Sequence, residues 1–167
     1  AKTDAEKVVL LDAKMTNPIA MFLNIHARFI FEDNFYKERA NGFVPAARLN
    51  ELMDNAQQVA FDGILDKRHP HFWASKLHFF IDDVPFYNFP YTFGYLFSQS
   101  IYAWAQTQAN FEEAYIALLR DTANMSTEEL AQKHLGVDLT KPDFWQAGAD
   151  LVKKDIDEFL ALSEQFI

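Results

Sequence analysis

Apolar residues recur at helical spacing along most of this 167-residue chain, and this pattern limits the possible fold more than any other feature. No stretch alternates apolar and polar residues with any strength, as a half-buried strand would. In the last segment, six apolar residues fall on one helical face: Phe144, Leu151, Val152, Ile156, Phe159 and Leu160. The sequence therefore predicts an all-α protein, a multi-helix bundle without internal repeats or linkers.

Helix start and stop signals divide the pattern into segments. A break or kink is expected at Thr16-Asn17-Pro18, between a short helix over 1–14 and a longer one over 18–40 that ends at Asn41-Gly42. Apolar residues surround the 18–40 helix on most sides, which predicts burial on several sides. Further helices are expected over 45–61, 91–106, 111–123, 126–135 and from 140 onward, with 72–80 undecided between helix and extended chain. The first of these should stop at Asp62-Gly63, and Ser126 to Glu129 match a capping box at the start of the 126–135 helix.

Composition excludes several classes of protein. A net charge of −9 argues against binding to nucleic acid or to an anionic membrane, and no apolar run looks long enough to span a bilayer. The absence of cysteine excludes disulfides and thiolate chemistry. We therefore expect one domain over residues 1–167, located in the cytoplasm. With 17 Phe in so small a domain, some rings should face a missing partner, so the chain is expected to self-associate.

The stretch from His69 to Trp104 combines His, Tyr, Pro and Gly with apolar residues more densely than any other. Its inner part, Asp82 to Pro90, contains two prolines and no helical stripe, which predicts a shaped loop leading into a helix near Tyr91. Such loops commonly present side chains to a binding cleft. Gly94, inside that helix, suggests close approach of another backbone or a ligand.

The histidines do not form a metal-binding pattern, because no two of them have the i, i+4 spacing of a zinc helix. His26 is expected to be a hydrogen-bonded core residue, and His134 to have a structural role near a helix end. His78, a few residues before the loop, is balanced between packing and ligand binding. We expect no metal ligands in this chain.

Four runs of the chain resemble the C-terminal part of oligoendopeptidase F, a zinc metallopeptidase family related to thimet oligopeptidase. These runs are NIHARFIFEDNFYKER, WASKLHFFI, PFYNFPYTFGYLFSQSIYAWA and HLGVDLTKPDFW. The zinc-binding HExxH sequence of that family is missing. The resemblance therefore implies a C-terminal fragment of the peptidase, whose upstream part would bind zinc and supply the Glu that acts as general base.

By the same resemblance, His78, Tyr87, Tyr91 and Tyr95 would bind the backbone of short peptide substrates and stabilise the oxyanion. Tyr91 and Tyr87 are the first candidates for a catalytic role, although the register leaves open which tyrosine does what. The intact parent would be a zinc-dependent metalloendopeptidase, and this chain alone would be inactive. Two alternatives stay open: a free-standing helical module that binds a peptide or ligand without catalysis, and a structural interaction domain.

Overall fold

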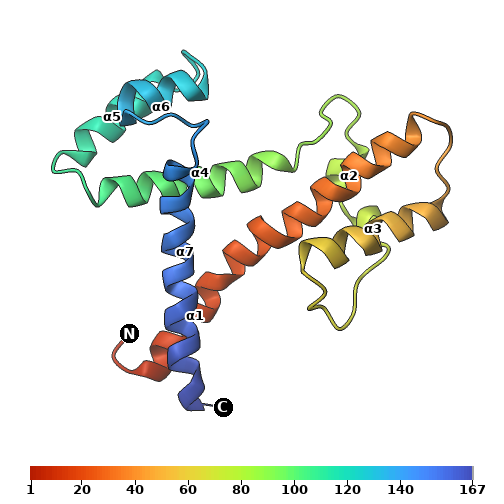
Figure 1. Cartoon of the computed structure of the whole chain (residues 1–167), viewed down its shortest axis with the longest axis horizontal. Coiled ribbons are helices and arrows are strands. Elements are labelled where there is room, and N and C mark those ends of the chain that lie inside the picture. Colours follow the sequence, from red (N-terminus) through yellow and green to blue (C-terminus); the bar gives the residue numbers. More distant parts are fainter. Residues whose placement is uncertain (167) are drawn as a thin grey trace. The chain divides into compact units, whose positions relative to one another are not determined.

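A computed structural model describes residues 1–166, and over this range it confirms the all-α prediction, with no strand. The chain divides into two compact units. Residues 13–93 form the first, here called the α2–α3 unit, and residues 1–12 join the chain from residue 94 onward in the second, the α5–α7 unit. Figure 1 shows the helices of each unit in the colours of the sequence. Compact units can belong to one domain, so the single-domain expectation stays a prediction.

Of the break or kink expected near Pro18, the break is wrong, because the chain remains helical, although its α-helical hydrogen bonding is interrupted directly after Pro18. The helix α1 (Asp4–Pro18) passes into a π-helical segment, η1 (Ile19–Asn24), and then into α2 (Ile25–Arg39). Pro18 itself has helical angles, with φ −60° and ψ −37°. The backbone N–H of Ile25 donates to the carbonyl of Ala20, five residues back. This wider turn lets the helix continue beyond the proline, whose nitrogen carries no hydrogen to donate.

Burial of α2 is less complete than its composition predicts. Among the residues that it buries are Ile25, Phe31 and Glu32. Phe29 is 41% exposed, and His26 is exposed, so the expectation of a core histidine there is wrong. The exposed residues His26, Phe29 and Tyr36 lie toward one side of α2, whereas the buried residues are spread over the other sides.

The helix α3 (Ala46–Ala60) lies beside α2 and shares its core, as expected from the segment 45–61 (Figure 1). Asp62 and Gly63 then adopt positive φ, at 49° and 71°, and end the helix. Two 3₁₀ turns follow, η2 (Phe72–Ser75) and η3 (Leu77–Phe80), which resolve the undecided segment. The buried core of this unit consists of Phe31, Val44, Leu52, Met53 and Ala56.

The α5–α7 unit contains most of α4 and three further helices, α5, α6 and α7. The bounds are α4 (Phe89–Ala105), α5 (Phe111–Asp121), α6 (Thr127–Leu135) and α7 (Pro142–Ser163), followed by the 3₁₀ turn η4 (Glu164–Phe166). The predicted capping box of α6 is confirmed, since Ser126 and Glu129 each accept the other's backbone N–H. Gly136 ends α6 with φ 68°. The buried core consists of Ile101, Leu118, Leu130, Ala131, Leu135 and Phe144.

The close approach of another backbone, one of the two expectations for Gly94, occurs instead at another glycine. A Cβ added at Gly94 would meet nothing within 4 Å. At Gly148 of α7, the same addition would come within 2.4 Å of Ser100 Oγ and 2.8 Å of the Ser100 nitrogen in α4. Gly148 therefore permits α4 and α7 to pack with their backbones in contact.

One helical stretch, Asp4–Arg39, has the length and hydropathy of a membrane span, contrary to the expectation from the apolar runs. Only 22% of its most apolar window is buried. Core helices of soluble proteins have the same properties, so this stretch by itself is a weak indication of a membrane.

Candidate functional site

The loop between η3 and α4 is fixed to α2 by one buried carboxyl group. Glu32 is 3% exposed, and its Oε1 accepts a hydrogen bond of 2.7 Å from the backbone N–H of Phe86. Phe86 has φ 58°, a conformation that a bulky residue adopts only when its surroundings hold it there. The loop is therefore a defined structure, in agreement with the shaped loop predicted from the sequence.

The first turn of α4 places Tyr91 at the end of this loop. The helix begins at Phe89, two residues before the predicted start, because Pro90 suits a first helical turn. The Thr92 hydroxyl donates a 2.6 Å hydrogen bond to the Met21 carbonyl, which holds this turn against the π-helical segment. Tyr91 thus has a backbone that is positioned independently of any ligand.

Three of the four site residues implied by the resemblance lie together: His78, Tyr87 and Tyr91. His78 Nε2 and the Tyr91 hydroxyl are 3.1 Å apart and share a hydrogen bond. The His78 ring is stacked on that of Tyr87 at 5.7 Å and meets that of Tyr91 edge-on at 5.6 Å. Tyr87 and Tyr91 are 44% and 39% exposed, so both phenols are open to an incoming group.

The hydrogen bond to His78 can direct the Tyr91 proton. If Nε2 carries the ring hydrogen, it donates to the Tyr91 oxygen and leaves the phenol hydrogen free to point outward. His78 Nδ1 is then the basic nitrogen; it is buried and has no hydrogen-bonding partner among residues 1–166. In this tautomer, the pair offers an outward phenol donor, the group that an oxyanion requires.

Arg28 and Asn88 belong to the same region, although neither was predicted from the sequence. The Arg28 guanidinium donates to Asn24 Oδ1 at 2.9 Å and to Asn88 Oδ1 at 3.4 Å. Burial lowers the pKa of Arg28, and the neighbouring Tyr91 opposes this effect. Asn88 is fully buried, with no partner for Nδ2 in the described part of the chain. The signal for Arg28 was its position as the only Lys, Arg, Asp or Glu between Met15 and Phe31.

Tyr95, the fourth implied residue, belongs to the other compact unit, the α5–α7 unit. It is half-buried. Its pKa is raised, first by burial and then by the negative charge of Asp155 in α7.

The described residues do not offer a ligand set for the zinc that the resemblance implies. Over residues 1–166, no three His, Asp or Glu side chains come close enough to hold a metal ion. The cluster supplies one imidazole and two phenols, whereas zinc sites in proteins are built from several His, Cys or carboxylate ligands.

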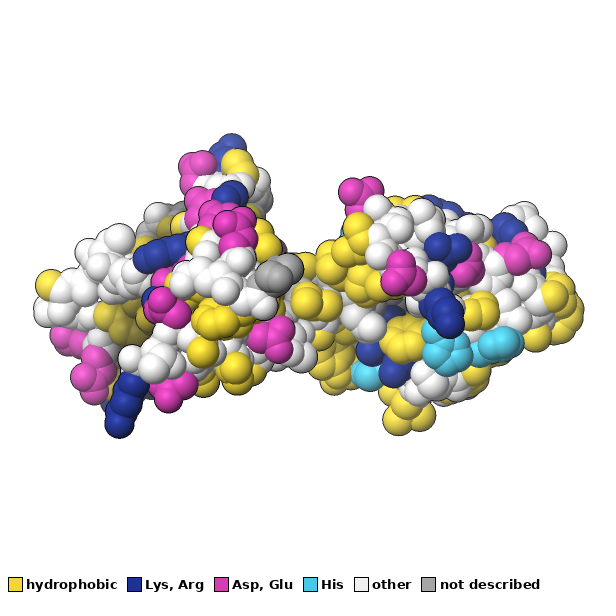
Figure 2. Space-filling view, turned by 90° about the horizontal axis from the view of Figure 1, so that it is seen from below, with side chains coloured by type: hydrophobic (Ala, Val, Ile, Leu, Met, Phe, Trp, Pro, Cys, Tyr) yellow, Lys and Arg dark blue, Asp and Glu magenta, His cyan; other side chains and the backbone are white. Residues whose placement is uncertain are grey.

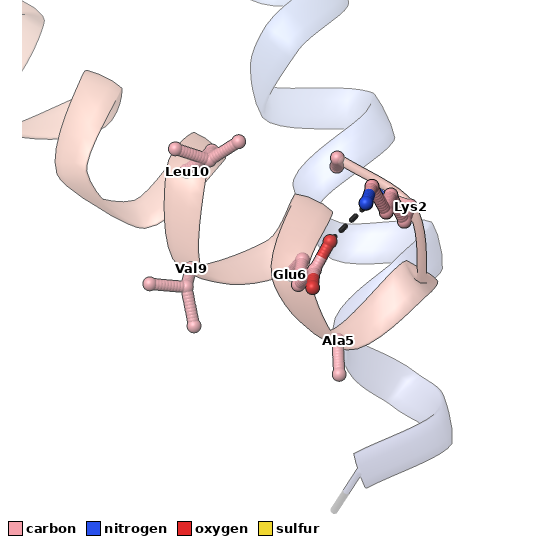
Figure 3. A pocket seen from close by; sticks show the side chains of 6 residues that line it. Lys2, Ala5, Glu6, Val9 and Leu10 are labelled. Atoms are coloured by element: carbon pink, nitrogen blue, oxygen red, sulfur yellow. Dashed lines mark hydrogen bonds between the residues drawn. The ribbon is translucent and has the colours of Figure 1, made fainter.

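Two other hollows have fewer side chains that could take part in a reaction. The hollow at the start of α1, shown in Figure 3, is lined by Ala5, Val9 and Leu10, and Glu6 accepts a 2.6 Å hydrogen bond from the Lys2 backbone N–H. An apolar groove of about 550 Å³ in the α5–α7 unit runs between α4 and α5 and includes Tyr102 and Tyr115. Neither contains a cluster of titratable groups comparable with His78, Tyr87 and Tyr91.

Comparison with known proteins adds no identification. The chain matches no family model, no curated protein and no solved structure.

Proposed function

We propose that this chain is the substrate-binding, C-terminal part of a cytoplasmic zinc-dependent oligoendopeptidase that hydrolyses short peptides. The zinc and the general base would be held by the upstream part of the same enzyme. Two independent observations support the proposal. The sequence runs resemble oligoendopeptidase F, and His78, Tyr87 and Tyr91 from those runs meet in one cluster.

The observation that carries the proposal is the 3.1 Å contact between His78 Nε2 and the Tyr91 hydroxyl. When water attacks a peptide carbonyl, negative charge develops on the carbonyl oxygen. A donor already directed at that oxygen stabilises the transition state more than the ground state. Tyr91 would donate this hydrogen bond, His78 would orient its proton, and the stacked Tyr87 would contact the peptide backbone.

Substitution of Tyr91 by Phe in the intact enzyme tests this role. Removal of one oxyanion donor lowers kcat on the order of 100- to 1,000-fold, and KM should change less because ground-state binding is mostly kept. We expect Tyr91→Phe to lower kcat about 100-fold while folding and zinc content stay intact. Tyr87→Phe should act mainly on KM. Steady-state kinetics on a short peptide measure both.

Tyr102→Phe is the matched control, because Tyr102 lies further along α4, belongs to the α5–α7 unit and is 61% exposed. It should leave kcat and KM unchanged. Wild-type kcat in Tyr91→Phe would show that Tyr91 only packs, or that Tyr87 or Tyr95 is the donor.

The apolar groove between α4 and α5 is the observation that favours the alternative, a free-standing module that binds a peptide or ligand. A groove lined by Phe97, Ile101 and Leu118 could hold an apolar peptide segment without any reaction. The coding sequence before Ala1 distinguishes the two functions. An in-frame HExxH shortly upstream supports the peptidase, and a start codon at that point supports the module.

A further inference from the structure

A second site lies in the α2–α3 unit, where a buried carboxyl group faces an aromatic cavity. The cavity has a volume of about 110 Å³ and is lined by eight residues from α2, α3, η2 and η3. They are Phe31, Glu32, Phe35, Tyr36, Leu49, Trp73, Phe79 and Phe80. Six of the eight are aromatic, and Glu32 is the only one with a charge.

Within residues 1–166, only one of the two carboxylate oxygens of Glu32 has a hydrogen-bonding partner. Its Oε1 accepts the Phe86 N–H, but its Oε2 is buried and has no hydrogen-bonding partner within residues 1–166. A buried polar atom without a partner is rare in proteins and costs roughly 1–3 kcal/mol, more when it is charged. No Lys, Arg or His nitrogen forms an ion pair with Glu32 in the described structure, although Arg28 lies one turn away on the same helix.

The walls of the cavity are fixed, and its mouth is open. Trp73 donates its indole N–H to Asn50 Oδ1 at 2.9 Å, and Phe31 meets Phe79 edge-on at 4.9 Å. At the rim, Tyr36 and Phe80 are 43% and 57% exposed, so a ligand can enter from solvent.

The charge around the cavity favours a cation. The pKa of Tyr36 is raised by burial first, and then by the negative charges of Glu32 and Asp82. The faces of aromatic rings attract cations within about 6 Å, and a carboxyl group adds a hydrogen-bond acceptor of opposite charge. One water needs roughly 10–15 Å³ of accessible volume, so the cavity can admit a small ammonium head with a short apolar stem.

We propose that this cavity binds the ammonium group of a peptide, with Oε2 of Glu32 as acceptor and the surrounding rings as walls. Two sources share this chemistry: the side chain of a lysine and the amino group at a peptide N-terminus. The cavity belongs to this chain alone, so binding does not require the proposed peptidase activity and can be tested separately from it.

Proton–nitrogen NMR of the isotopically labelled chain tests the proposal, with the Trp73 indole and the Phe86 amide as reporters. Nα-acetyl-lysine methylamide presents only a side-chain ammonium, and alaninamide presents only an α-ammonium. Nα-acetyl-norleucine methylamide is the uncharged counterpart of the first. At least one ammonium probe should shift both reporters in a saturable way, at least tenfold more tightly than the uncharged probe, and the preferred probe identifies the source.

Glu32→Gln is the decisive variant, because the amide oxygen can still accept the Phe86 N–H while the charge is removed. It should weaken ammonium binding at least tenfold, whereas Glu51→Gln, the same change at an exposed ion pair on α3, should leave it unchanged. Equal binding of charged and uncharged probes, or no binding of any probe, would overturn the proposal. If no probe binds, the role that remains for Glu32 is to accept the Phe86 N–H and so hold the loop. These wild-type comparisons decide the question even if Glu32→Gln fails to fold.

Discussion

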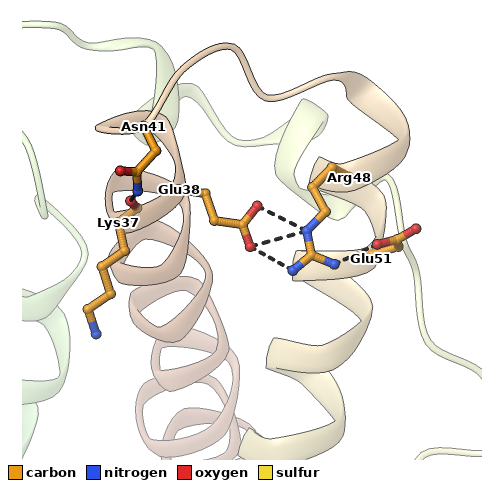
Figure 4. A network of polar contacts seen from close by, with 5 residues as sticks. All are labelled: Lys37, Glu38, Asn41, Arg48 and Glu51. Carbon is orange, nitrogen blue, oxygen red and sulfur yellow. Dashed lines mark hydrogen bonds and ion pairs between the residues drawn. The ribbon is translucent and has the colours of Figure 1, made fainter.

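At the scale of single residues, the best defined polar contact joins the two helices of the α2–α3 unit. Arg48 of α3 donates through Nε and Nη2 to the carboxylate of Glu38 in α2, with the shortest contact at 2.6 Å, and through Nη1 to Glu51 (Figure 4). This fork geometry fixes both side chains, unlike most exposed ion pairs. The Arg48 hydrogen bonds hold the pKa of Glu38 below its ordinary value of 4.5.

The lowered pKa of Glu38 makes the contribution of this pair depend on pH. A carboxyl group whose pKa is lower in the folded state stabilises that state above its ordinary pKa, and the contribution disappears as pH falls through the folded value. We therefore expect Glu38→Gln to lower the urea midpoint of this unit at pH 7, with the difference from wild type closing below pH 4.5. The Trp73 indole N–H signal follows the unfolding of this unit.

Asp33→Asn provides the control for Glu38, because it removes an exposed pair with Lys37 inside the single helix α2. It should change the midpoint much less at pH 7. A difference between Glu38→Gln and wild type that stays constant down to pH 3 would mean that the ion pair is not its cause.

The candidate site was predictable at the residue scale only where a side chain belonged to a dense local pattern. His78, Tyr87 and Tyr91 stood out within one aromatic stretch, and the structure brings them together. Glu32 and Arg28 lie about 50 residues away in the sequence. Their burial depends on how the loop folds back onto α2, which local spacing does not encode.

At the scale of elements, the contact between α4 and α7 depends on one glycine. Gly148→Ala would place a methyl group 2.8 Å from the Ser100 nitrogen. This nitrogen belongs to the backbone, so it cannot relieve the clash by rotating away as the end of a flexible side chain could. Overpacking of this kind costs about 1–3 kcal/mol. We expect the free energy of unfolding of the α5–α7 unit to fall by that amount in chemical denaturation.

Gly94→Ala is the matched change in α4. Its Cβ would meet nothing within 4 Å, and alanine favours a helix by about 1 kcal/mol over glycine, so stability should be unchanged or slightly higher. Equal destabilisation by the two substitutions would contradict the assigned packing.

Most helices were predictable from the sequence because their ends carry local signals. The capping box at Ser126 and the Asp62-Gly63 stop are examples. The continuous helix through Pro18 was not predictable in this way, because a π-helical turn has no sequence signature that separates it from a break. The position of the close-packed glycine also depended on which helices meet.

At the scale of the whole molecule, many large apolar side chains remain exposed. Phe43 is 84% exposed, Ile64 73% and Leu77 72%, and Figure 2 shows hydrophobic side chains over much of the face that it presents. Proteins that stay monomeric rarely expose large contiguous apolar patches. An upstream part of a peptidase that covers such surface would account for this exposure.

We therefore expect the isolated chain to self-associate and to bind a hydrophobic dye. Light scattering should give a mass at least twice that of the monomer at high concentration, and the mass should fall on dilution. A monomer at all concentrations, without dye binding, would contradict the expectation that this surface is normally covered.

We propose that this chain provides the substrate side of a zinc peptidase and does not itself hold the metal. Zinc content after dialysis and cleavage of a short peptide should be measured on the chain alone and on the chain joined to the part encoded before it. We predict no retained zinc and no cleavage for the chain alone. The joined protein should retain one zinc per chain and cleave the peptide until a chelator is added. Stoichiometric zinc with chelator-sensitive cleavage by the chain alone, or no cleavage by the joined protein, would contradict the claim.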